Sequence, residues 1–178
     1  MTLALGAELP AFTLPDTDER PHTLPDEAGE AATVVVFTCN HCPYALAWHD
    51  RLIDVVRDYR DRGVAFFFVN PNDAERYPDD SFAAMKERVA ADGGWPAPYL
   101  RDESQEVARA FGAKTTPDVF VFDSERHLAY RGAPDSDYQD PAKRAEWLRS
   151  ALDALLAGQR PDPATTDPVG CSVKWKQR

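Results

Sequence analysis

The sequence predicts an α/β fold built on a central sheet whose first strands are parallel. Two apolar runs, 33–37 and 64–69, are rich in β-branched and aromatic residues, as is typical of strands buried on both faces. A helical pattern of apolar residues follows each run, over 43–62 and 80–91. This alternation of strands and helices predicts parallel strands joined by crossover helices.

The first 30 residues are predicted to form an irregular N-terminal arm that contains a β-hairpin. Prolines interrupt this segment repeatedly, and its extended pieces are short, at 11–14 and 22–24. The arm therefore extends the predicted fold instead of forming part of its central sheet.

The second half of the chain predicts a mixed sheet, because it adds an antiparallel pair to the parallel strands. The expected elements are a short strand at 99–100, a short helix at 103–111, strands at 118–122 and 127–130 joined by a turn, and an amphipathic helix at 142–156. A proline-rich tail, 159–178, has no clear pattern. Neither a linker nor an internal repeat divides the chain, so we expect one domain over 1–178.

Length and charge limit the function classes. At 178 residues the chain is long enough to bury a core without disulfide bonds. The net charge of −10 argues against nucleic acid or an anionic membrane surface as a partner. The N-terminus lacks a basic segment before an apolar run, and no run approaches membrane-spanning length, so we expect a cytoplasmic protein.

The chemistry of the chain is expected at Cys39-Asn40-His41-Cys42, which lies between the run 33–37 and the helix-like stretch that begins at Pro43. A CxxC motif serves either zinc binding or redox chemistry, and its place at a strand-to-helix junction favours redox use. A zinc site needs four ligands, and the other histidines are scattered singly, so we predict no metal. The thiols need no cofactor.

The expected roles of the two cysteines follow from the helix. The first turn of a helix favours a thiolate through free N–H groups and the positive end of the dipole. We expect Cys39 to occupy that place and to attack a disulfide, and Cys42, one turn away, to resolve the mixed disulfide. Asn40 and His41 would set the redox poise, with His41 adding positive potential beside the Cys39 sulfur.

Two further segments bear on the site. Thr116 and Pro117 precede a predicted strand, where a cis peptide would direct the Thr116 backbone toward the end of the sheet. Cys171 in the tail is a third thiol, which could resolve an intermediate, pair with a neighbouring subunit in a homodimer, or serve as a partly buried structural thiol.

These features together resemble the thioredoxin-fold superfamily. The similarity rests on the strand–CxxC–helix unit, on Thr116-Pro117 and on the opening Leu-Pro-Ala-Phe-Thr-Leu at 9–14. Within the superfamily, the strings 37–44 and 169–175 are similar to peroxiredoxin-like proteins grouped with alkyl hydroperoxide reductase and thiol-specific antioxidant proteins. The resemblance implies a three-layer α/β/α fold with a central mixed sheet, and a cis peptide bond before Pro117.

The resemblance offers two alignments of the motif. Peroxiredoxins place the attacking cysteine directly before the helix, with Thr or Ser three residues earlier and a proline four residues before that. Cys42 would take that place, but Cys39 and Val35 then stand where Thr/Ser and proline belong. Thioredoxins use the first cysteine of CxxC, here Cys39, although Thr38 replaces the usual tryptophan. This second alignment keeps both cysteines functional and is preferred.

The sequence therefore predicts a thiol–disulfide oxidoreductase, and the resemblance to peroxiredoxin-like proteins implies an antioxidant activity. Its substrates would be protein or small-molecule disulfides, and its reductant a thioredoxin-type or low-molecular-weight thiol. One alternative is a thiol peroxidase that reduces peroxides. Alternatives of another class are a non-catalytic binding module and a metal carrier that uses Cys39, Cys42 and a histidine.

Overall fold

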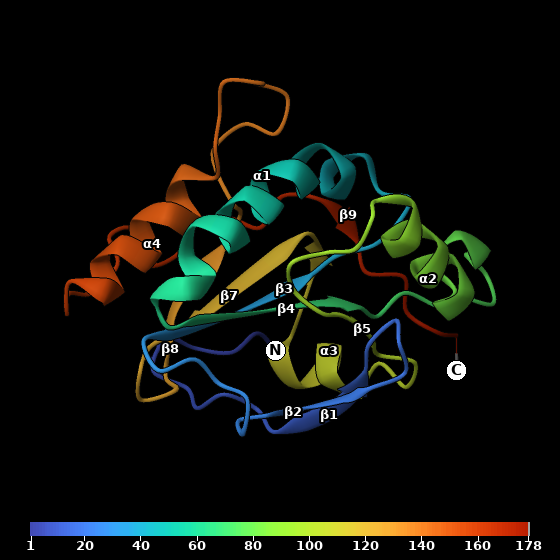
Figure 1. The fold of residues 1–178 in the computed structure, drawn as a ribbon, viewed down its shortest axis with the longest axis horizontal. Coiled ribbons are helices and arrows are strands. Elements are labelled where there is room, and N and C mark those ends of the chain that lie inside the picture. Colours follow the sequence, from blue (N-terminus) through green and yellow to red (C-terminus); the bar gives the residue numbers. More distant parts are fainter. Residues whose placement is uncertain (178) are drawn as a thin grey trace.

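The computed structural model describes residues 1–177, and its centre is a five-stranded mixed sheet (Figure 1). The strand order is β5 (Tyr99–Arg101), β4 (Val64–Asn70), β3 (Ala32–Phe37), β7 (Asp118–Phe122) and β8 (Leu128–Gly132). The strands β3, β4 and β5 are parallel, whereas β7 is antiparallel to both β3 and β8. The predicted parallel unit and the predicted antiparallel pair are both confirmed.

Helices cover both faces of this sheet, as the predicted three-layer arrangement requires. The helices α1 (Pro43–Tyr59), α2 (Phe82–Ala91) and α4 (Glu146–Leu156) lie on one face (Figure 1). The other face carries α3 (Glu106–Phe111) together with the predicted N-terminal hairpin, formed by β1 (Phe12–Pro15) and β2 (Pro21–Leu24).

The strand β3 contributes to a hydrophobic core on each side of the sheet. Val34 and Val36 pack with the α1 and α4 side, whereas Val35 and Phe37 pack with α3 and the hairpin. All six residues of β3 are buried. Such a strand has little freedom to shift along its neighbours, because a slip of one residue would exchange its two faces. The CxxC motif, which follows Phe37, therefore has a fixed position at the carboxyl end of β3.

The start of α2 differs from the prediction in a way that matters for the site. The helix begins at Phe82, because the Ser81 hydroxyl caps it by accepting from the Ala84 N–H at 3.1 Å. The residues before the cap form a short 3₁₀ turn, η2 (Pro78–Asp80), which buries Asp80 completely.

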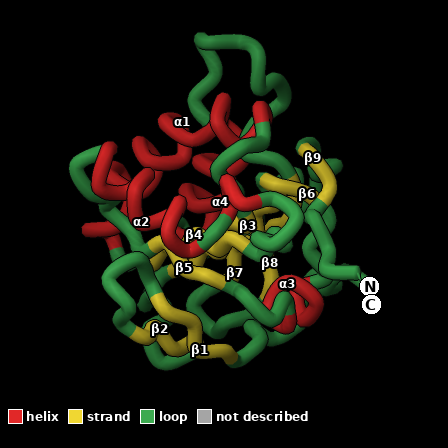
Figure 2. The backbone as a smooth tube through the Cα atoms, turned by 90° about the vertical axis from the view of Figure 1, so that its right-hand side faces the viewer, coloured by secondary structure: helices red, strands yellow, loops and turns green. Residues whose placement is uncertain are grey.

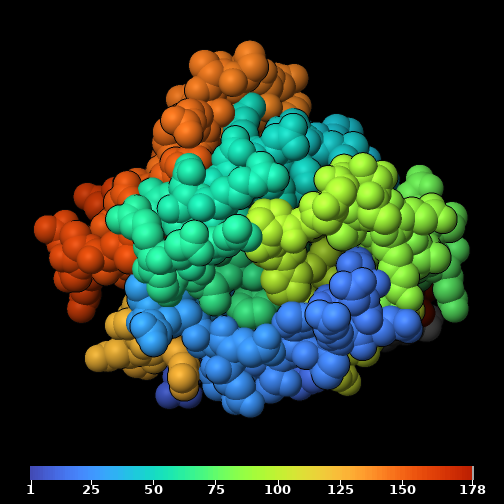
Figure 3. All heavy atoms as spheres, in the orientation of Figure 1, coloured from blue at the N-terminus to red at the C-terminus, as the bar shows by residue number. Residues whose placement is uncertain are grey.

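Other helix boundaries also differ from the expected ones. The first helix ends at Tyr59 and continues as a 3₁₀ turn, η1 (Arg60–Arg62), and α3 begins at Glu106. The helix α4 begins at Glu146, because the preceding residues form a loop that stands out from the body (Figure 3). Arg51 holds that loop by donating to the backbone carbonyls of Tyr138 and Asp140.

The tail contains an element that the sequence did not predict. Two short strands, β6 (Thr115–Thr116) and β9 (Cys171–Ser172), pair antiparallel beside the main sheet (Figure 2). In this pairing Cys171 lies opposite Thr116. Among the described residues, no helix has the length and apolar character that crossing a bilayer requires.

Candidate active site

The CxxC motif forms the loop between β3 and α1, and its second cysteine begins the helix. Cys42 is the N-cap residue, with extended backbone angles of φ −73° and ψ 125°, and Pro43 is the first helical residue. Cys39 lies three residues farther back in the loop. The expectation that Cys39 stands directly before the helix is therefore wrong, and Cys42 holds the position at the positive end of the helix dipole.

Both sulfurs of the motif contact Thr116 and are closed off from solvent. Cys39 and Cys42 are each 0% exposed. The Cys39 Sγ lies 3.3 Å from the Thr116 hydroxyl, and the Cys42 Sγ lies 3.2 Å from the Thr116 carbonyl oxygen. The Thr116–Pro117 peptide is cis, as the resemblance implied. The structure thus brings together the motif and the Thr-Pro pair that the sequence had singled out.

The pKa values of the two buried thiols are shifted in opposite directions. The hydrogen bond from the Cys39 thiol lowers the pKa of Cys42 well below its usual range, and the Cys171 thiol and the Ala45 N–H add to this effect against the cost of burial. The same hydrogen bond and burial raise the pKa of Cys39. Together with the place of Cys42 at the helix N-terminus, these directions favour the thiolate on Cys42 and the proton on Cys39.

One neighbour opposes this assignment. The Thr116 carbonyl accepts from Cys42 when that sulfur carries a proton, so it favours the thiol form. Four donors, the thiols of Cys39 and Cys171 and the backbone N–H groups of Ala45 and Cys171, act in the other direction. Because hydrogen bonds to a charged acceptor are roughly twice as strong as neutral ones, we expect the four donors to prevail.

A titration of the thiolate absorbance in the ultraviolet tests this assignment. An ordinary cysteine with a pKa of about 8.5 is almost entirely protonated near pH 6. We expect the reduced protein to show about one thiolate per chain at that pH, and Cys42→Ser to lose it. Since the folded pKa lies below the ordinary value, the signal disappears only in stronger acid. A titration near 8.5 for every thiol would contradict the assignment.

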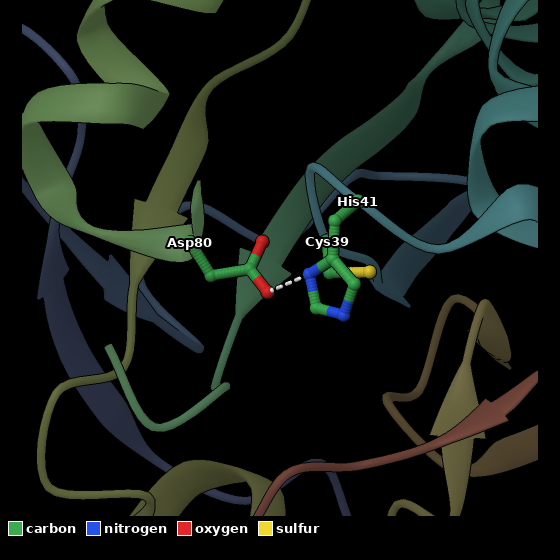
Figure 4. Close-up of side chains that lie close together, drawn as sticks. All are labelled: Cys39, His41 and Asp80. Atoms are coloured by element: carbon green, nitrogen blue, oxygen red, sulfur yellow. Dashed lines mark ion pairs between the residues drawn. The ribbon is translucent and has the colours of Figure 1, made fainter. Parts of the chain in front are cut away.

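The loop between the cysteines is held by a buried carboxylate (Figure 4). The Asp80 side chain is fully buried and lies 2.5 Å from the His41 Nδ1. Asp80 also accepts from the backbone N–H of Asn40 at 2.6 Å. His41 stacks on Tyr77 at 5.6 Å between ring centroids. His41 thus lies beside the Cys39 sulfur, as expected, but its position depends on Asp80.

Sequence reasoning missed Asp80, and its surroundings show why it matters. Its two oxygens accept from the side-chain amides of Asn70 at 3.2 Å and Asn72 at 2.9 Å. Asn70 is the last residue of β4 and Asn72 lies in the turn after it, and both reach the same end of the sheet as the motif because β3 and β4 are parallel. The available signal was the polar Asn-Pro-Asn-Asp string at the carboxyl end of a buried strand.

Asn40 is positioned by side chains from two other elements. Its side-chain oxygen accepts from Arg88 at 3.0 Å and from the Tyr99 hydroxyl at 2.7 Å, and Arg88 also donates to the Cys39 carbonyl at 3.0 Å. These contacts hold the loop backbone. Asn40 therefore supports the geometry of the motif. Among the described residues its side chain bonds to Asp79, Arg88 and Tyr99 and to neither sulfur.

Three potential metal-ligating atoms lie close together in this region. The ligand atoms of Cys39, His41 and Asp80 all lie within 4.8 Å of one another. Each of these groups already has partners, since Asp80 accepts from three N–H groups and contacts His41, and Cys39 contacts Thr116. A metal ion would have to displace those contacts, so the arrangement fits a hydrogen-bonded thiol site better than a metal centre.

The third cysteine lies at the same site. Cys171 packs against Cys39, Cys42 and Ala45, and it is partly exposed. Burial and the contact with Cys42 raise the pKa of the Cys171 thiol to about 11. The sequence left open whether Cys171 reaches the motif, and the pairing of β9 with β6 brings it there.

Comparisons with known proteins bear on the fold and the family of the chain. A solved structure of an uncharacterized conserved protein from Geobacillus kaustophilus is 40% identical, with a TM-score of 0.93 over 98% of this chain and 94% of that one. The search of curated proteins gave no significant match.

More distant structures share the fold. A putative thiol:disulfide interchange protein DsbE from Chlorobium tepidum is 21% identical, with a TM-score of 0.68 over 87% of this chain and 99% of that one. Peroxidoxin BcpB from Mycobacterium tuberculosis is 16% identical, with a TM-score of 0.63 over 88% and 97%. The fold is thus thioredoxin-like. The model of the AhpC/TSA family matches residues 5–131, which is more than half of the sequence, and the chain therefore belongs to the AhpC/TSA family of thioredoxin-fold, peroxiredoxin-like redox proteins.

Proposed function

We propose that the protein is a thiol–disulfide oxidoreductase that uses the Cys39–Cys42 pair. The observation that carries the proposal is the pair itself: two buried sulfurs beside a helix N-terminus, both in contact with Thr116, at 3.3 Å and 3.2 Å, and with pKa values shifted in opposite directions. Such a pair suits thiol–disulfide exchange, which needs an attacking thiolate and a second thiol within reach of it. Substrates would be protein or small-molecule disulfides, and a low-molecular-weight or thioredoxin-type thiol would restore the pair.

The geometry supports roles opposite to those that the sequence suggested. Attack was assigned to Cys39 because that residue was expected at the start of the helix, and the structure gives this position to Cys42. We therefore assign attack to Cys42. Its thiolate bonds to one sulfur of the substrate disulfide and releases the other as a thiolate. Cys39 then gives up its proton, attacks the Cys42 sulfur and releases the second thiol, so that the substrate gains two electrons and the pair becomes a disulfide.

The low pKa of Cys42 also indicates the direction in which the pair works. Factors that stabilise the thiolate stabilise the reduced form and raise the reduction potential. We expect a potential above the value of about −270 mV of thioredoxin, so that a thioredoxin-type dithiol readily reduces the pair and the pair in turn reduces disulfides of higher potential. Equilibration in glutathione buffers, followed by acid quenching and peptide mapping, measures the potential. Failure to form a Cys39–Cys42 disulfide at any glutathione ratio would refute the proposal.

A second candidate function is peroxide reduction, and one observation favours it. Cys42 stands directly before the helix, which is the place that the peroxiredoxin alignment gives to the attacking cysteine. Rapid conversion of Cys42 to a sulfenic acid by hydrogen peroxide would support a peroxidase. Oxidation at the rate of a free thiol in solution would leave disulfide exchange as the function.

A further inference from the structure

Among the described residues, the three sulfurs of the site differ in their access to solvent. Cys39 and Cys42 are 0% exposed, whereas Cys171 is partly exposed. Thiol–disulfide exchange requires an attacking thiolate to reach one of the two bonded sulfurs. In this conformation substrate and reductant alike reach Cys42 only through a local opening, whereas a disulfide that includes Cys171 offers a partly exposed sulfur without one.

The position of Cys171 is built into the fold. Cys171 lies opposite Thr116 in the β6–β9 pair, and Thr116 contacts both Cys39 and Cys42. Gly170 permits this close approach, since a Cβ at that position would lie 2.3 Å from the Thr116 carbonyl oxygen. The absence of a side chain at Gly170 thus lets the tail pass directly over the loop that carries the cis peptide.

The chain beyond Cys171 is also fixed to the body of the protein. The Val173 N–H donates to the Lys114 carbonyl at 3.1 Å, and Val173 is buried. The Lys174 N–H donates to the side-chain oxygen of Asn72 at 2.9 Å. Together with the β6–β9 pairing, these contacts keep Cys171 packed against the cluster formed by Cys39, Cys42 and Ala45.

We propose, on the basis of the function proposed above, that Cys171 is a third redox thiol that connects the buried Cys39–Cys42 pair to external thiols. After the pair has been oxidised, the Cys171 thiolate attacks the Cys42 sulfur. The Cys42–Cys171 bond forms and the Cys39–Cys42 bond breaks. Cys39 leaves as a thiolate and takes up the proton that Cys171 has lost, so this step moves the disulfide without a net change in electrons.

The second stage uses a reductant with two thiols. One of its thiolates attacks the exposed Cys171 sulfur and forms a mixed disulfide, and Cys42 leaves as a thiolate. The second thiol of the reductant then attacks its own sulfur in the mixed disulfide and releases Cys171. The reductant supplies two electrons and two protons in total and ends as an intramolecular disulfide.

The acidities of the sulfurs suit this order of events. In the reduced protein, burial and the contact with Cys42 keep Cys171 protonated and hence unreactive. Once Cys42 is part of a disulfide it no longer carries a negative charge, so its contribution to the raised pKa of Cys171 is removed. Cys171 therefore becomes a better nucleophile only after the pair has been oxidised.

The first experiment removes the competing thiol. We expect Cys39→Ser, treated with oxidised glutathione and then quenched in acid, to contain an intramolecular Cys42–Cys171 disulfide in peptide mapping by mass spectrometry. A protein in which Cys42 stays glutathionylated while Cys171 remains a free thiol would overturn the proposal.

The second experiment measures reduction of the oxidised pair. Oxidised wild-type protein and its variants are mixed with dithiothreitol and quenched at intervals. We expect Cys171→Ser to slow the reduction at least about tenfold, because access to a bonded sulfur limits the rate. Gly170→Ala should slow it similarly by displacing the tail, whereas Ser172→Ala, an exposed neighbour on β9, should have no effect. Equal rates in wild type and Cys171→Ser would overturn the proposal.

The two proposals fail separately. If the wild-type protein never forms a Cys39–Cys42 disulfide in glutathione buffers, the oxidoreductase proposal falls. If Cys171→Ser forms that disulfide with the wild-type potential and is also reduced at the wild-type rate, only the role of Cys171 falls. Circular dichroism of Gly170→Ala verifies that the variant is folded before its rate is compared.

Discussion

The substitution Cys42→Ser is expected to abolish disulfide exchange, with a loss of at least about 10³-fold in the turnover of a disulfide reporter. The reason is that Cys42 carries the thiolate, whereas the thiol of Cys39 is buried and holds its proton. A serine hydroxyl at position 42 remains protonated and cannot make the attack. The measurement is the rate of reporter reduction, with the protein folded according to circular dichroism.

The matched variant Cys39→Ser separates attack from resolution. Combined with Cys171→Ser, so that neither other thiol can resolve it, this variant keeps Cys42 and should accumulate a mixed disulfide with a substrate, which can be isolated in acid and assigned by mass spectrometry. Cys42→Ser should accumulate none through Cys39. A mixed disulfide on Cys39 in the absence of Cys42, formed as fast as in the matched variant, would restore the roles that the sequence suggested.

The substitution Asp80→Ala is expected to lower the free energy of unfolding by about 3–5 kcal/mol, since it removes one partner from a buried polar cluster. The amides of Asn70 and Asn72 would lose their acceptor, and so would the backbone N–H of Asn40. Each buried donor left without a partner costs about 1–3 kcal/mol. Urea unfolding monitored by circular dichroism measures the change.

The neighbouring residue supplies the control. Asp79 is exposed, and only its backbone carbonyl contacts the site, through the Asn40 side chain. Asp79→Ala should therefore stay within about 0.5 kcal/mol of the wild type. Asp80→Ala should also slow the formation of the mixed disulfide, because it frees the 39–42 loop. If both variants unfold at the same urea concentration, Asp80 does not hold the loop.

The sequence predicted the sheet and the place of the motif because both depend on long, regular patterns. The run 33–37 is apolar at every position except Thr33, and the CxxC follows it directly. The roles of the cysteines depended on where the first helix begins. The expected start directly after Cys39 was three residues too early, because the helix begins at Pro43. A proline in the first helical position is common, so Pro43 was the available signal that Cys42 is the cap.

The parts of the site that the sequence did not reveal depend on tertiary contacts. Asp80 lies in a turn of three residues, where burial cannot be inferred from periodicity. The strand β9 has only two residues, and its partner β6 is equally short, so neither gives an alternating pattern. Gly170 looks like an ordinary loop glycine until its distance to Thr116 is known.

Asn72 connects the site to the C-terminal tail through two hydrogen bonds, so the strand β9 that carries Cys171 and the loop that carries the dithiol share one anchor. Its amide nitrogen donates to Asp80, and its amide oxygen accepts from Lys174, so one side chain connects the loop beneath the motif to the tail. Further hydrogen bonds hold the tail: Val173 donates to the Lys114 carbonyl, and the Lys174 carbonyl accepts from the Asp73 N–H and the Gln105 side chain. Detachment of the tail therefore requires several of these hydrogen bonds to break together, which sets the free energy of this local opening. Hydrogen exchange at Val173 would report how often the covering strand lifts from the dithiol.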